Sequence, residues 1–429
     1  MKLNLIFIFI VYQILQILMI PIVFIYLIIR KINKKPVFGS FKERFGFIPK
    51  NKTNKKTIWL HAVSVGEILS IENLINQIKK ENTNTTCYVT TGTITGKNIA
   101  NQKLNANYVS FLPYDFLIVM LIAFKRIKPK KIIIVEAEIW PNLLIIAHLL
   151  KIPLFLINAR INKRSEQKYF IFKFILKNIF NLFDQILTQT EQDKILFEKL
   201  GINKNKVKVL GNIKVINVLA KKENSKIINL NNNYKILLAG SIHPGELDIY
   251  LELFAKLNQE TKNLRLILAP RHFDWENQLI EKVNKTNQKY YLYNEKNSIN
   301  LDENINKILK DNNILLICKL GELFKLYQIA NIFYLGGTFV NIGGHNLLEP
   351  AVWSIPSIIG PYYQNTKIIA EELNIKNGIF IAKDTNSLYL KSKMLILNED
   401  LSKNMGRNSF DWLKTQSNMI AHKIKEILY

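Results

Sequence analysis

The feature that most constrains this chain is a repeated alternation of short apolar stretches with amphipathic helical stretches after Pro36. A first series holds six strand-like runs: Thr57–His61, Cys87–Thr91, Tyr108–Leu112, Lys131–Glu136, Pro153–Asn158 and Val207–Leu210. A second series holds six more: Lys235–Ala239, Leu264–Ala269, Tyr290–Tyr293, Ile314–Cys318, Asn331–Leu335 and Ser357–Ile359. Helical patterns follow many of them: Glu67–Lys80, Ile139–Leu150, Pro244–Asn258, Gly321–Ala330 and Asn346–Trp353. Strands that alternate with helices indicate parallel βαβ units, so the sequence predicts an α/β fold with two doubly wound, Rossmann-like domains.

The domain boundaries follow from a change in composition. Val218–Tyr234 is polar, rich in Asn and Lys and without clear periodicity, which is typical of a linker. We therefore expect a first domain over 36–217, a linker over 218–234 and a second domain over 235–429, whose last helices can pack back on the first. Two such sheets should face a cleft, and ligands should bind outside the carboxyl ends of the strands.

The N-terminal segment, 1–35, predicts a membrane anchor with a basic flank. Leu3–Ile29 carries no charge and is long enough, at roughly 40 Å, to cross a hydrocarbon core of about 30 Å. Four basic residues follow it, namely Arg30, Lys31, Lys34 and Lys35, against Lys2 alone in front. This bias places the rest of the chain in the cytoplasm. Pro21 leaves open a kink or a shallow, monotopic insertion.

Net charge and cysteine content limit the partners and the redox compartment that we expect for this chain. The formal net charge is +26, which favours anionic partners. No zinc knuckle, RNP-like stretch or basic heptad run is found, so nucleic acid is not expected. Cys87 and Cys318 cannot form a disulfide framework, which fits a reducing cytoplasm.

Two candidate sites follow strands of the first domain. Gly66 should let the chain turn tightly after the first strand, and Glu67 then falls in the first turn of a helix. That carboxylate can complement the helix dipole, or it can act as a general base on an acceptor hydroxyl. Glu136 and Glu138 follow a buried strand, but no Asp-x-Asp sequence or nearby His completes a metal site, so we expect no metal.

The second domain carries loops suited to a nucleotide. Small residues in Ala239–Glu246 allow backbone amides to approach a phosphate, and Arg271 offers a forked donor. Glycines in Leu335–Thr338 and Gly343-Gly344 should leave amides free for an anion ahead of a helix. Glu349 is expected one turn into that helix, where its carboxylate can accept the ribose hydroxyls. Gly360-Pro361 should close the wall of this site.

Taken together these segments resemble the transferases of 3-deoxy-D-manno-octulosonic acid (Kdo) in lipid A biosynthesis. The matching segments run in order along nearly the whole chain: His61–Glu67, Glu136–Asn142, Asn158–Arg160, Gly211–Lys214, Ala239–Glu246, Pro270–His272, Gly321–Leu323, Gly343–Ala351 and Gly360-Pro361.

The resemblance implies a GT-B glycosyltransferase of lipopolysaccharide biosynthesis at the inner membrane. Its reaction would be a metal-independent, inverting transfer from CMP-Kdo to the phosphorylated lipid A precursor, without a cofactor. It implies that Glu67 is the general base and that Glu136 and Lys214 stabilise the transition state. It also implies CMP binding at Pro270, Arg271, Leu320, Gly321, Glu322, Asn346, Leu347, Leu348 and Glu349.

The chain departs from the family pattern at three places. Val215-Ile216 follow Lys214 where Phe-Asp is usual, so any role of that Asp is absent. Phe273–Trp275 replace the usual Pro-Glu-Arg, which removes a second arginine, and Leu347 replaces a common proline. The departures leave the reaction class intact and put the detailed donor contacts in question.

Two other functions remain open at this point. One is a GT-B transferase that uses a UDP-sugar for another membrane glycolipid or a peptidoglycan precursor. The other is a non-catalytic binding protein with a degenerate site. The joint retention of Glu67, Arg271 and Glu349 argues against this second alternative.

Overall fold

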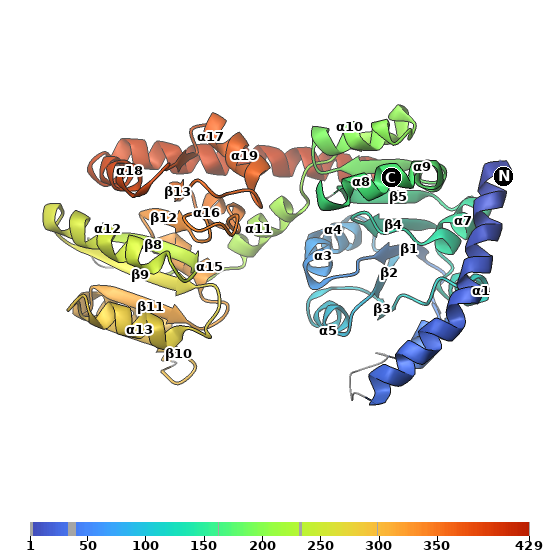
Figure 1. Ribbon diagram of the computed structural model, residues 1–429, viewed down its shortest axis with the longest axis horizontal. Helices are drawn as coiled ribbons and strands as arrows, with labels where there is room; N and C mark the ends of the chain where they lie inside the picture. The colour runs from blue at the N-terminus through green and yellow to red at the C-terminus, as the bar shows by residue number, and fades with distance from the viewer. Residues whose placement is uncertain (1–2, 33–39, 162, 231–233, 298, 429) are drawn as a thin grey trace. The chain divides into compact units, whose positions relative to one another are not determined.

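The computed structural model describes residues 3–32, 40–161, 163–230, 234–297 and 299–428 (Figure 1). The chain divides into two compact units. Unit 1 contains the chain up to Asn217 and again from Asn418 onward, and unit 2 contains Val218–Ser417. Lys34 and Lys35, half of the expected basic flank, lie outside the described residues.

Unit 1 is built on a parallel seven-stranded sheet with the order β3-β2-β1-β4-β5-β6-β7. Its strands are β1 Lys56–His61, β2 Thr85–Thr91, β3 Tyr108–Phe111, β4 Lys131–Val135, β5 Leu154–Ala159, β6 Gln185–Thr188 and β7 Val207–Val209. Its helices are α1 Leu3–Ile32, α2 Phe41–Arg44, α3 Val65–Ser70, α4 Glu72–Glu81, α5 Ile94–Lys103, α6 Leu117–Ile127, α7 Pro141–Leu149, α8 Lys163–Ile171, α9 Lys173–Phe180, α10 Glu191–Lys199 and the 3₁₀ turn η1 Lys204–Lys206.

Unit 2 is built on a second parallel seven-stranded sheet, with the order β10-β11-β9-β8-β12-β13-β14. Its strands are β8 Lys235–Ile242, β9 Leu264–Pro270, β10 Tyr290–Asn294, β11 Ile314–Cys318, β12 Ile332–Leu335, β13 Ser357–Ile359 and β14 Ile379–Ile381. Its helices are α12 Leu247–Glu260, α13 Glu276–Asn284, α14 Leu301–Asp311, α15 Leu323–Leu326, the 3₁₀ turn η2 Tyr327–Ile329, α16 Leu348–Val352, α17 Lys367–Ile375 and α18 Thr385–Leu397.

Two further helices cross the boundaries between the units. α11, Lys214–Glu223, begins in unit 1, and its helical conformation extends into the segment that the sequence predicted to be an irregular linker. α19, Glu399–Leu428, ends in unit 1, where Lys423 donates a hydrogen bond to the carbonyl of Val209 (2.5 Å).

The α/β class with two doubly wound sheets is confirmed. The central strands are buried along their whole length, as β2 is, because helices cover both faces of a parallel sheet. The sequence analysis missed β6 and β14, which have four and three residues. The single helix expected over Glu67–Lys80 is two helices, α3 and α4, that meet at Ile71.

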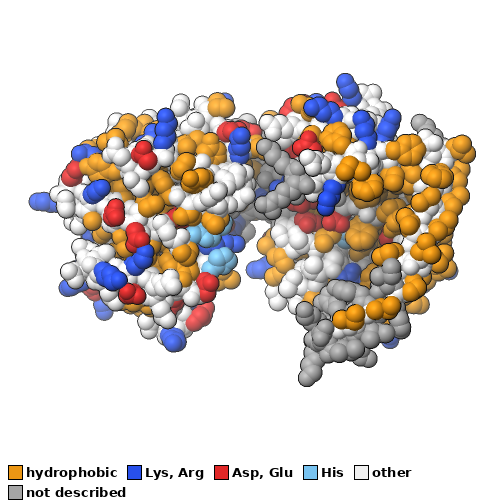
Figure 2. Space-filling model, in the orientation of Figure 1, with side chains coloured by type: hydrophobic (Ala, Val, Ile, Leu, Met, Phe, Trp, Pro, Cys, Tyr) orange, Lys and Arg blue, Asp and Glu red, His pale blue; other side chains and the backbone are white. Residues whose placement is uncertain are grey.

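The N-terminal helix α1 packs against unit 1 and contacts α7 and α9. Leu5 and Ile8 are buried in the hydrophobic core of that unit. Leu3–Pro21 is long and apolar enough to cross a membrane. Hydrophobic side chains gather along α1 on the face seen in Figure 2.

Candidate active site

The motifs of unit 1 lie where its strand order reverses direction. β1 pairs with β4 at this point, with His61 opposite Ile134. His61–Glu67 follows β1, and Glu136–Asn142 follows β4. Ligands of doubly wound sheets bind beyond the carboxyl ends of such a strand pair. The predicted catalytic segments therefore share the switch point of this sheet.

Glu67 is bound into the start of α3. Ser64 is the N-cap of this helix, and its hydroxyl accepts a hydrogen bond from the Glu67 amide (3.3 Å). The Glu67 carboxylate in turn accepts hydrogen bonds from the Val63 amide (2.8 Å) and the Ser64 hydroxyl (2.7 Å). This reciprocal pattern is a variant of the capping box. The capping role of Glu67 is thus confirmed, and its side chain stays 9% exposed at the carboxyl end of the sheet.

Gly66 does not make the tight turn that the sequence predicted. It lies inside α3 and is not among the residues with positive φ. A Cβ at Gly66 would meet only the Ser64 hydroxyl, at 3.9 Å. No contact within unit 1 therefore requires glycine here, although the missing methyl group leaves space beside the hydroxyl that touches Glu67.

A group of charged side chains surrounds Glu67. Burial raises the pKa of the Glu136 carboxyl; the Glu67 charge raises it further, while Arg160 and Lys214 lower it. Burial also raises the pKa of the Glu138 carboxyl, and Glu67 and Glu136 add to the rise. The structure therefore brings together all three predicted catalytic residues and adds Arg160 and Glu138.

The backbone at Glu136 is strained, with φ at +60° directly after β4. A non-glycine residue in this region costs about 1–2 kcal/mol, and such strain clusters at functional sites. The Glu136 amide donates to the Ile157 carbonyl (2.9 Å), which holds this conformation to β5.

His61 is a buried residue of the site whose surroundings could not be read from the sequence. It is fully buried at the end of β1, and its Nδ1 lies 3.0 Å from the hydroxyl of Thr90. Its Nε2 is buried and has no hydrogen-bond partner among the described residues, and the ring meets Trp140 edge to face with centroids 6.1 Å apart. Burial lowers the pKa of His61 to about 4, so the ring is neutral at pH 7.

The switch point of unit 2 lies between β8 and β12, where Gly240 pairs with Leu335. Glu246 follows β8, is fully buried, and holds the two strand ends together. Its carboxylate accepts four amide hydrogen bonds, from His243 (3.0 Å), Gly337 (2.7 Å), Thr338 (3.0 Å) and Phe339 (3.0 Å).

The prediction that the glycine loops leave their amides free for an anion is therefore wrong. The Gly337 amide binds Glu246, and the Gly343 and Gly344 amides both donate to the Gly337 carbonyl (3.0 and 2.9 Å). The glycines allow close loop packing instead. A Cβ at Gly336 would lie 2.1 Å from the Ser241 carbonyl oxygen, and one at Gly360 would lie 2.3 Å from that of Thr338.

Three histidines and one arginine gather at the same end of unit 2. The Nε2 atoms of His243 and His345 are 2.7 Å apart, and the two rings stack. Burial lowers the pKa of His345 to about 4, and the His243, Arg271 and His272 charges add to this effect. Because His243, the Arg271-His272 pair and His345 lie in three separate loops, their sequence positions alone gave no signal of this cluster.

The predicted donor-binding residues at the ends of β9 and β11 differ in exposure. Pro270 ends β9 and is buried, whereas Arg271 is exposed and its amide donates to the Ile242 carbonyl (3.0 Å). Leu320 is 81% exposed, and Gly321 has a φ of +92° with no atom within 4 Å of an added Cβ. Glu322 forms an ion pair with Lys325 (2.7 Å).

The helix that carries Glu349 begins later than predicted. α16 starts at Leu348, so Glu349 is its second residue and Asn346 lies before it. The Asn346 side-chain oxygen accepts a hydrogen bond from the Leu348 amide (2.9 Å), and Leu347 and Leu348 are buried. The Glu349 carboxylate forms an ion pair with Lys221 of α11 (2.9 Å), so Asn346 and Glu349 do not share a helical face.

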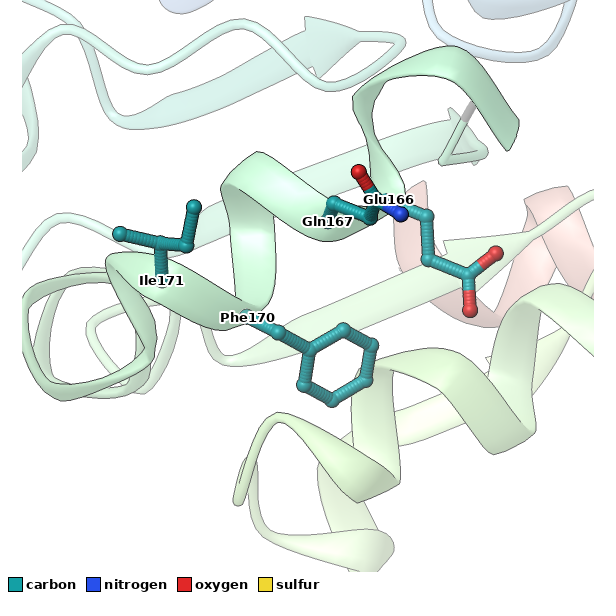
Figure 3. A pocket seen from close by; sticks show the side chains of 4 residues that line it. All are labelled: Glu166, Gln167, Phe170 and Ile171. Atoms are coloured by element: carbon teal, nitrogen blue, oxygen red, sulfur yellow. The ribbon is translucent and has the colours of Figure 1, made fainter.

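Two further features of the described residues concern metal binding and the surface of unit 1. The described residues contain no group of three or more His, Cys, Asp or Glu side chains that could hold a metal ion. A shallow depression is lined by Glu166, Gln167, Phe170 and Ile171 of α8, and Figure 3 shows that these side chains do not converge. It includes no predicted site residue.

Known proteins resemble the chain in sequence and in fold. The family described as "3-Deoxy-D-manno-octulosonic-acid transferase (kdotransferase)" matches residues 39–217. A 3-deoxy-D-manno-octulosonic acid transferase of Aquifex aeolicus is 31% identical over 82% of this chain and 89% of its own length. The chain belongs to this family. Kdo transfer is the activity that these matches support, and the chain is a glycosyltransferase.

Two further comparisons concern length and fold. A bifunctional glycosyltransferase/methyltransferase of Fusobacterium nucleatum is 31% identical over 87% of this chain, which spans 59% of the length of that protein. The UDP-GlcNAc 2-epimerase of Neisseria meningitidis aligns with 86% of this Kdo transferase homologue and 100% of its own chain (TM-score 0.59, 15% identity). With that likeness and the two parallel sheets, the predicted GT-B fold is confirmed.

Proposed function

We propose that the chain transfers Kdo from CMP-Kdo to a hydroxyl of the phosphorylated lipid A precursor, with inversion and without a metal. The observation that carries this proposal is the position of Glu67. Its carboxylate lies at the switch point of unit 1, near Glu136. The charge of Glu67 raises the pKa of the Glu136 carboxyl, and the charges of Arg160 and Lys214 lower that pKa.

In this mechanism Glu67 is the general base. Its carboxylate accepts the proton of the acceptor hydroxyl as the hydroxyl oxygen attacks the anomeric carbon of Kdo. The bond from that carbon to the phosphate oxygen breaks, and its electron pair leaves with CMP. Hydrogen bonds from Val63 and Ser64 orient the carboxylate and leave it able to approach a hydroxyl.

Glu136 and Lys214 support the transition state from the same unit. The family resemblance assigns them this role. An electrostatic interaction between the two side chains is consistent with it, because burial raises the pKa of the Glu136 carboxyl and the Lys214 charge lowers it. Lys214 begins α11, and it can stabilise negative charge that develops on the substrates.

The donor nucleotide is proposed to bind unit 2. Arg271 supplies hydrogen-bond donors for the phosphate, and the neutral His243–His345 pair supplies one N–H, because its other N–H is used in the bond between the two Nε2 atoms. These groups replace the role first expected of the glycine amides. The Glu349 carboxylate is proposed to accept the ribose hydroxyls, held in place by Lys221. The contribution of Pro270, Leu320, Gly321, Glu322, Leu347 and Leu348 would then be to shape the base and ribose site.

The acceptor is proposed to be reached at the cytoplasmic face of the inner membrane. The apolar α1 and the net charge of +26 support this location, because the acceptor is a phosphorylated lipid.

Nucleotide binding tests the donor assignment. Stabilisation of the protein against heat by CMP and not by UDP is expected, whereas preference for UDP would favour a UDP-sugar donor. Glu349→Ala should weaken CMP binding by about 1.5–3 kcal/mol and should cost far less with 2′,3′-dideoxy-CMP. Arg271→Ala should weaken CMP and hardly affect cytidine, which lacks the phosphate.

Calorimetry of both variants with the three ligands separates these roles. An equal loss of CMP and dideoxy-CMP affinity in Glu349→Ala would mean that the carboxylate serves only its ion pair with Lys221. Lys221→Ala is the matched variant, since it removes the same ion pair and leaves the carboxylate in place.

A further inference from the structure

The N-terminal helix carries a polar stripe that pairs with unit 1. The Tyr12 hydroxyl donates to the Asp115 carboxylate (3.0 Å), and Gln13 donates to the side chain of Asn142 (2.7 Å). Gln16 donates to the Asp115 carbonyl (2.8 Å) and accepts from Asn142 (3.2 Å). Every polar side chain between residues 12 and 16 of α1 is therefore bonded to the globular part of the unit.

The same face of α1 is apolar toward the N-terminus. Leu5 and Ile8 are 5% and 6% exposed within the core of unit 1. Residues at spacings of three and four lie on one side of a helix, so Leu5, Ile8, Tyr12 and Gln16 form one continuous inward stripe. The N-terminal half of α1 is thus packed lengthwise on unit 1.

The partner of this stripe is built into the fold. The Asp115 carboxylate also accepts hydrogen bonds from the Asn142 and Leu143 amides (both 2.9 Å), which caps the first turn of α7. Burial raises the pKa of Asp115 to about 7. Hydrogen bonds from Asn142, Leu143 and Tyr12 lower this pKa and so partly offset the effect of burial. Removing α1 would take away one of the donors that stabilise a buried carboxylate.

The opposite face of α1 has no such partner among the described residues. Its large apolar side chains are exposed: Leu3, Phe7, Ile10, Ile14, Leu15, Ile17 and Leu18. α9 packs against α1 and bears Phe174 and Ile175, also exposed, together with Lys173 and Lys177. Apolar side chains beside lysines are typical of a surface that meets anionic lipid headgroups.

A helix in this position cannot also cross the bilayer. Tyr12 is the midpoint of the apolar segment Leu3–Pro21, so in a spanning helix Asp115 and the start of α7 would lie at the centre of the hydrocarbon. Loop backbone and buried carboxylates are not tolerated there against lipid. The next described segment, from Ser40, is also packed on unit 1, where Arg44 donates to the carbonyls of Leu112 (3.0 Å) and Gly92 (2.5 Å).

We propose that α1 is a monotopic anchor that lies along the membrane surface, with its inward stripe on unit 1 and its outward face in lipid. The partner of this surface is an anionic bilayer leaflet. Both ends of α1 then lie on the same side of the membrane as unit 1. This inference rests on the proposed membrane location and is independent of the proposed chemistry.

Labelling of the full-length chain tests the topology. A short hydrophilic extension with one cysteine is placed before Met1, and a membrane-impermeant maleimide is applied to spheroplasts and to inverted inner-membrane vesicles. The native Cys87 and Cys318 are buried and give little background. Lys256→Cys, on the exposed surface of α12 and without the extension, reports the side of the globular part.

The expected result is that both cysteines react in inverted vesicles and are protected in spheroplasts. Reaction of the extension in spheroplasts alone would overturn the inference and establish a spanning helix. Recovery of the chain in the soluble fraction would instead overturn the membrane location itself.

Gln16→Leu distinguishes the two arrangements by stability. The change makes α1 more apolar, so a spanning helix would be unaffected or strengthened. A docked helix loses its bonds to Asp115 and Asn142, and the Tm of the membrane-bound protein should fall by about 2–4 °C. An unchanged Tm would count against docking, and Ile14→Leu on the outward face is the matched control.

Discussion

Each unit carries a Gly-Glu pair after the first strand of its sheet, and the two pairs have different surroundings. Glu67 follows Gly66 after β1, is 9% exposed, and among the described residues its carboxylate accepts hydrogen bonds from its own turn alone, from Val63 and Ser64. Glu246 follows Gly245 after β8, is fully buried, and accepts four amide hydrogen bonds that join two strand ends.

The comparison teaches that equivalent positions at a switch point can serve chemistry or architecture. A carboxylate surrounded by four amides is fixed and desolvated, and it has little capacity left for a substrate hydroxyl. A carboxylate that accepts two hydrogen bonds from its own turn keeps lone pairs for a further donor. In the proposed mechanism unit 1 supplies the reactive acid, whereas the acid of unit 2 holds the loop ends beside Arg271 and the neutral histidine pair.

The largest expected effect is on the chemistry of unit 1. Glu67→Gln keeps the size of the side chain and removes the proton acceptor, so the rate of transfer should fall roughly 10²–10⁴-fold. CMP affinity, measured by calorimetry, should stay nearly unchanged because the proposed nucleotide site lies in unit 2. Glu72→Gln, one helix later, is the control, and a Glu67→Gln rate within about threefold of the parent would exclude the base.

The next effect is on the stability of unit 2. Glu246→Ala removes the acceptor of four amides, and each buried amide left unpaired costs about 1–3 kcal/mol. We expect a loss of roughly 3–5 kcal/mol in the free energy of unfolding, measured by denaturant titration. If Glu246→Ala has the same free energy of unfolding as the parent but no longer transfers Kdo, Glu246 is not a structural acid, and the proposed difference between Glu67 and Glu246 is wrong.

A smaller effect concerns the space beside Glu67. Gly66→Ala should leave stability unchanged or raise it by about 0.5–1 kcal/mol, since Gly66 is helical and an added Cβ meets nothing closer than 3.9 Å. The methyl group would intrude where the acceptor hydroxyl must approach, so transfer should slow about 10–100-fold. Full activity with unchanged stability would show that the acceptor does not pass this face.

The smallest effect is the pH dependence of unit 2. The pKa of His345 is lowered to about 4, so between about pH 6.5 and 4 the unfolded chain binds a proton that the folded chain does not. The contribution of His345 to the free energy of unfolding is fully present above about pH 6.5 and is lost as the pH falls toward 4. His345→Asn should make that decline shallower.

The measurement is the free energy of unfolding from pH 8 to 4. His345 is only partly buried, so the slope should change by less than the roughly 1.4 kcal/mol per pH unit of one full proton. Parallel curves for the parent and the variant would contradict a neutral histidine pair.

The sequence was sufficient to predict the α/β architecture and the grouping of Glu67 with Glu136 in unit 1. Strand-and-helix alternation depends on local periodicity, and residues that follow neighbouring parallel strands must meet at one edge, as Glu67 and Glu136 do. Family resemblance supplied their roles, which remain proposals.

What the sequence could not supply were contacts set by loop conformation. A glycine-rich stretch has the same letters whether its amides bind an anion or Glu246, and only the folded loops show the second arrangement. The His243–His345 pair joins residues about a hundred positions apart, and the start of α16 depends on the turn that Asn346 makes. These contacts have no local periodicity from which to be inferred.

The most direct test of the central account is the product itself. Purified full-length protein in vesicles, given CMP-Kdo and lipid A precursor, should convert the precursor to species heavier by one or more Kdo residues, as followed by mass spectrometry. The same incubation with Glu67→Gln, or with a UDP-sugar in place of CMP-Kdo, should leave the precursor mass unchanged. An unmodified precursor with CMP-Kdo and active parent protein, or equal conversion by Glu67→Gln, would contradict the account.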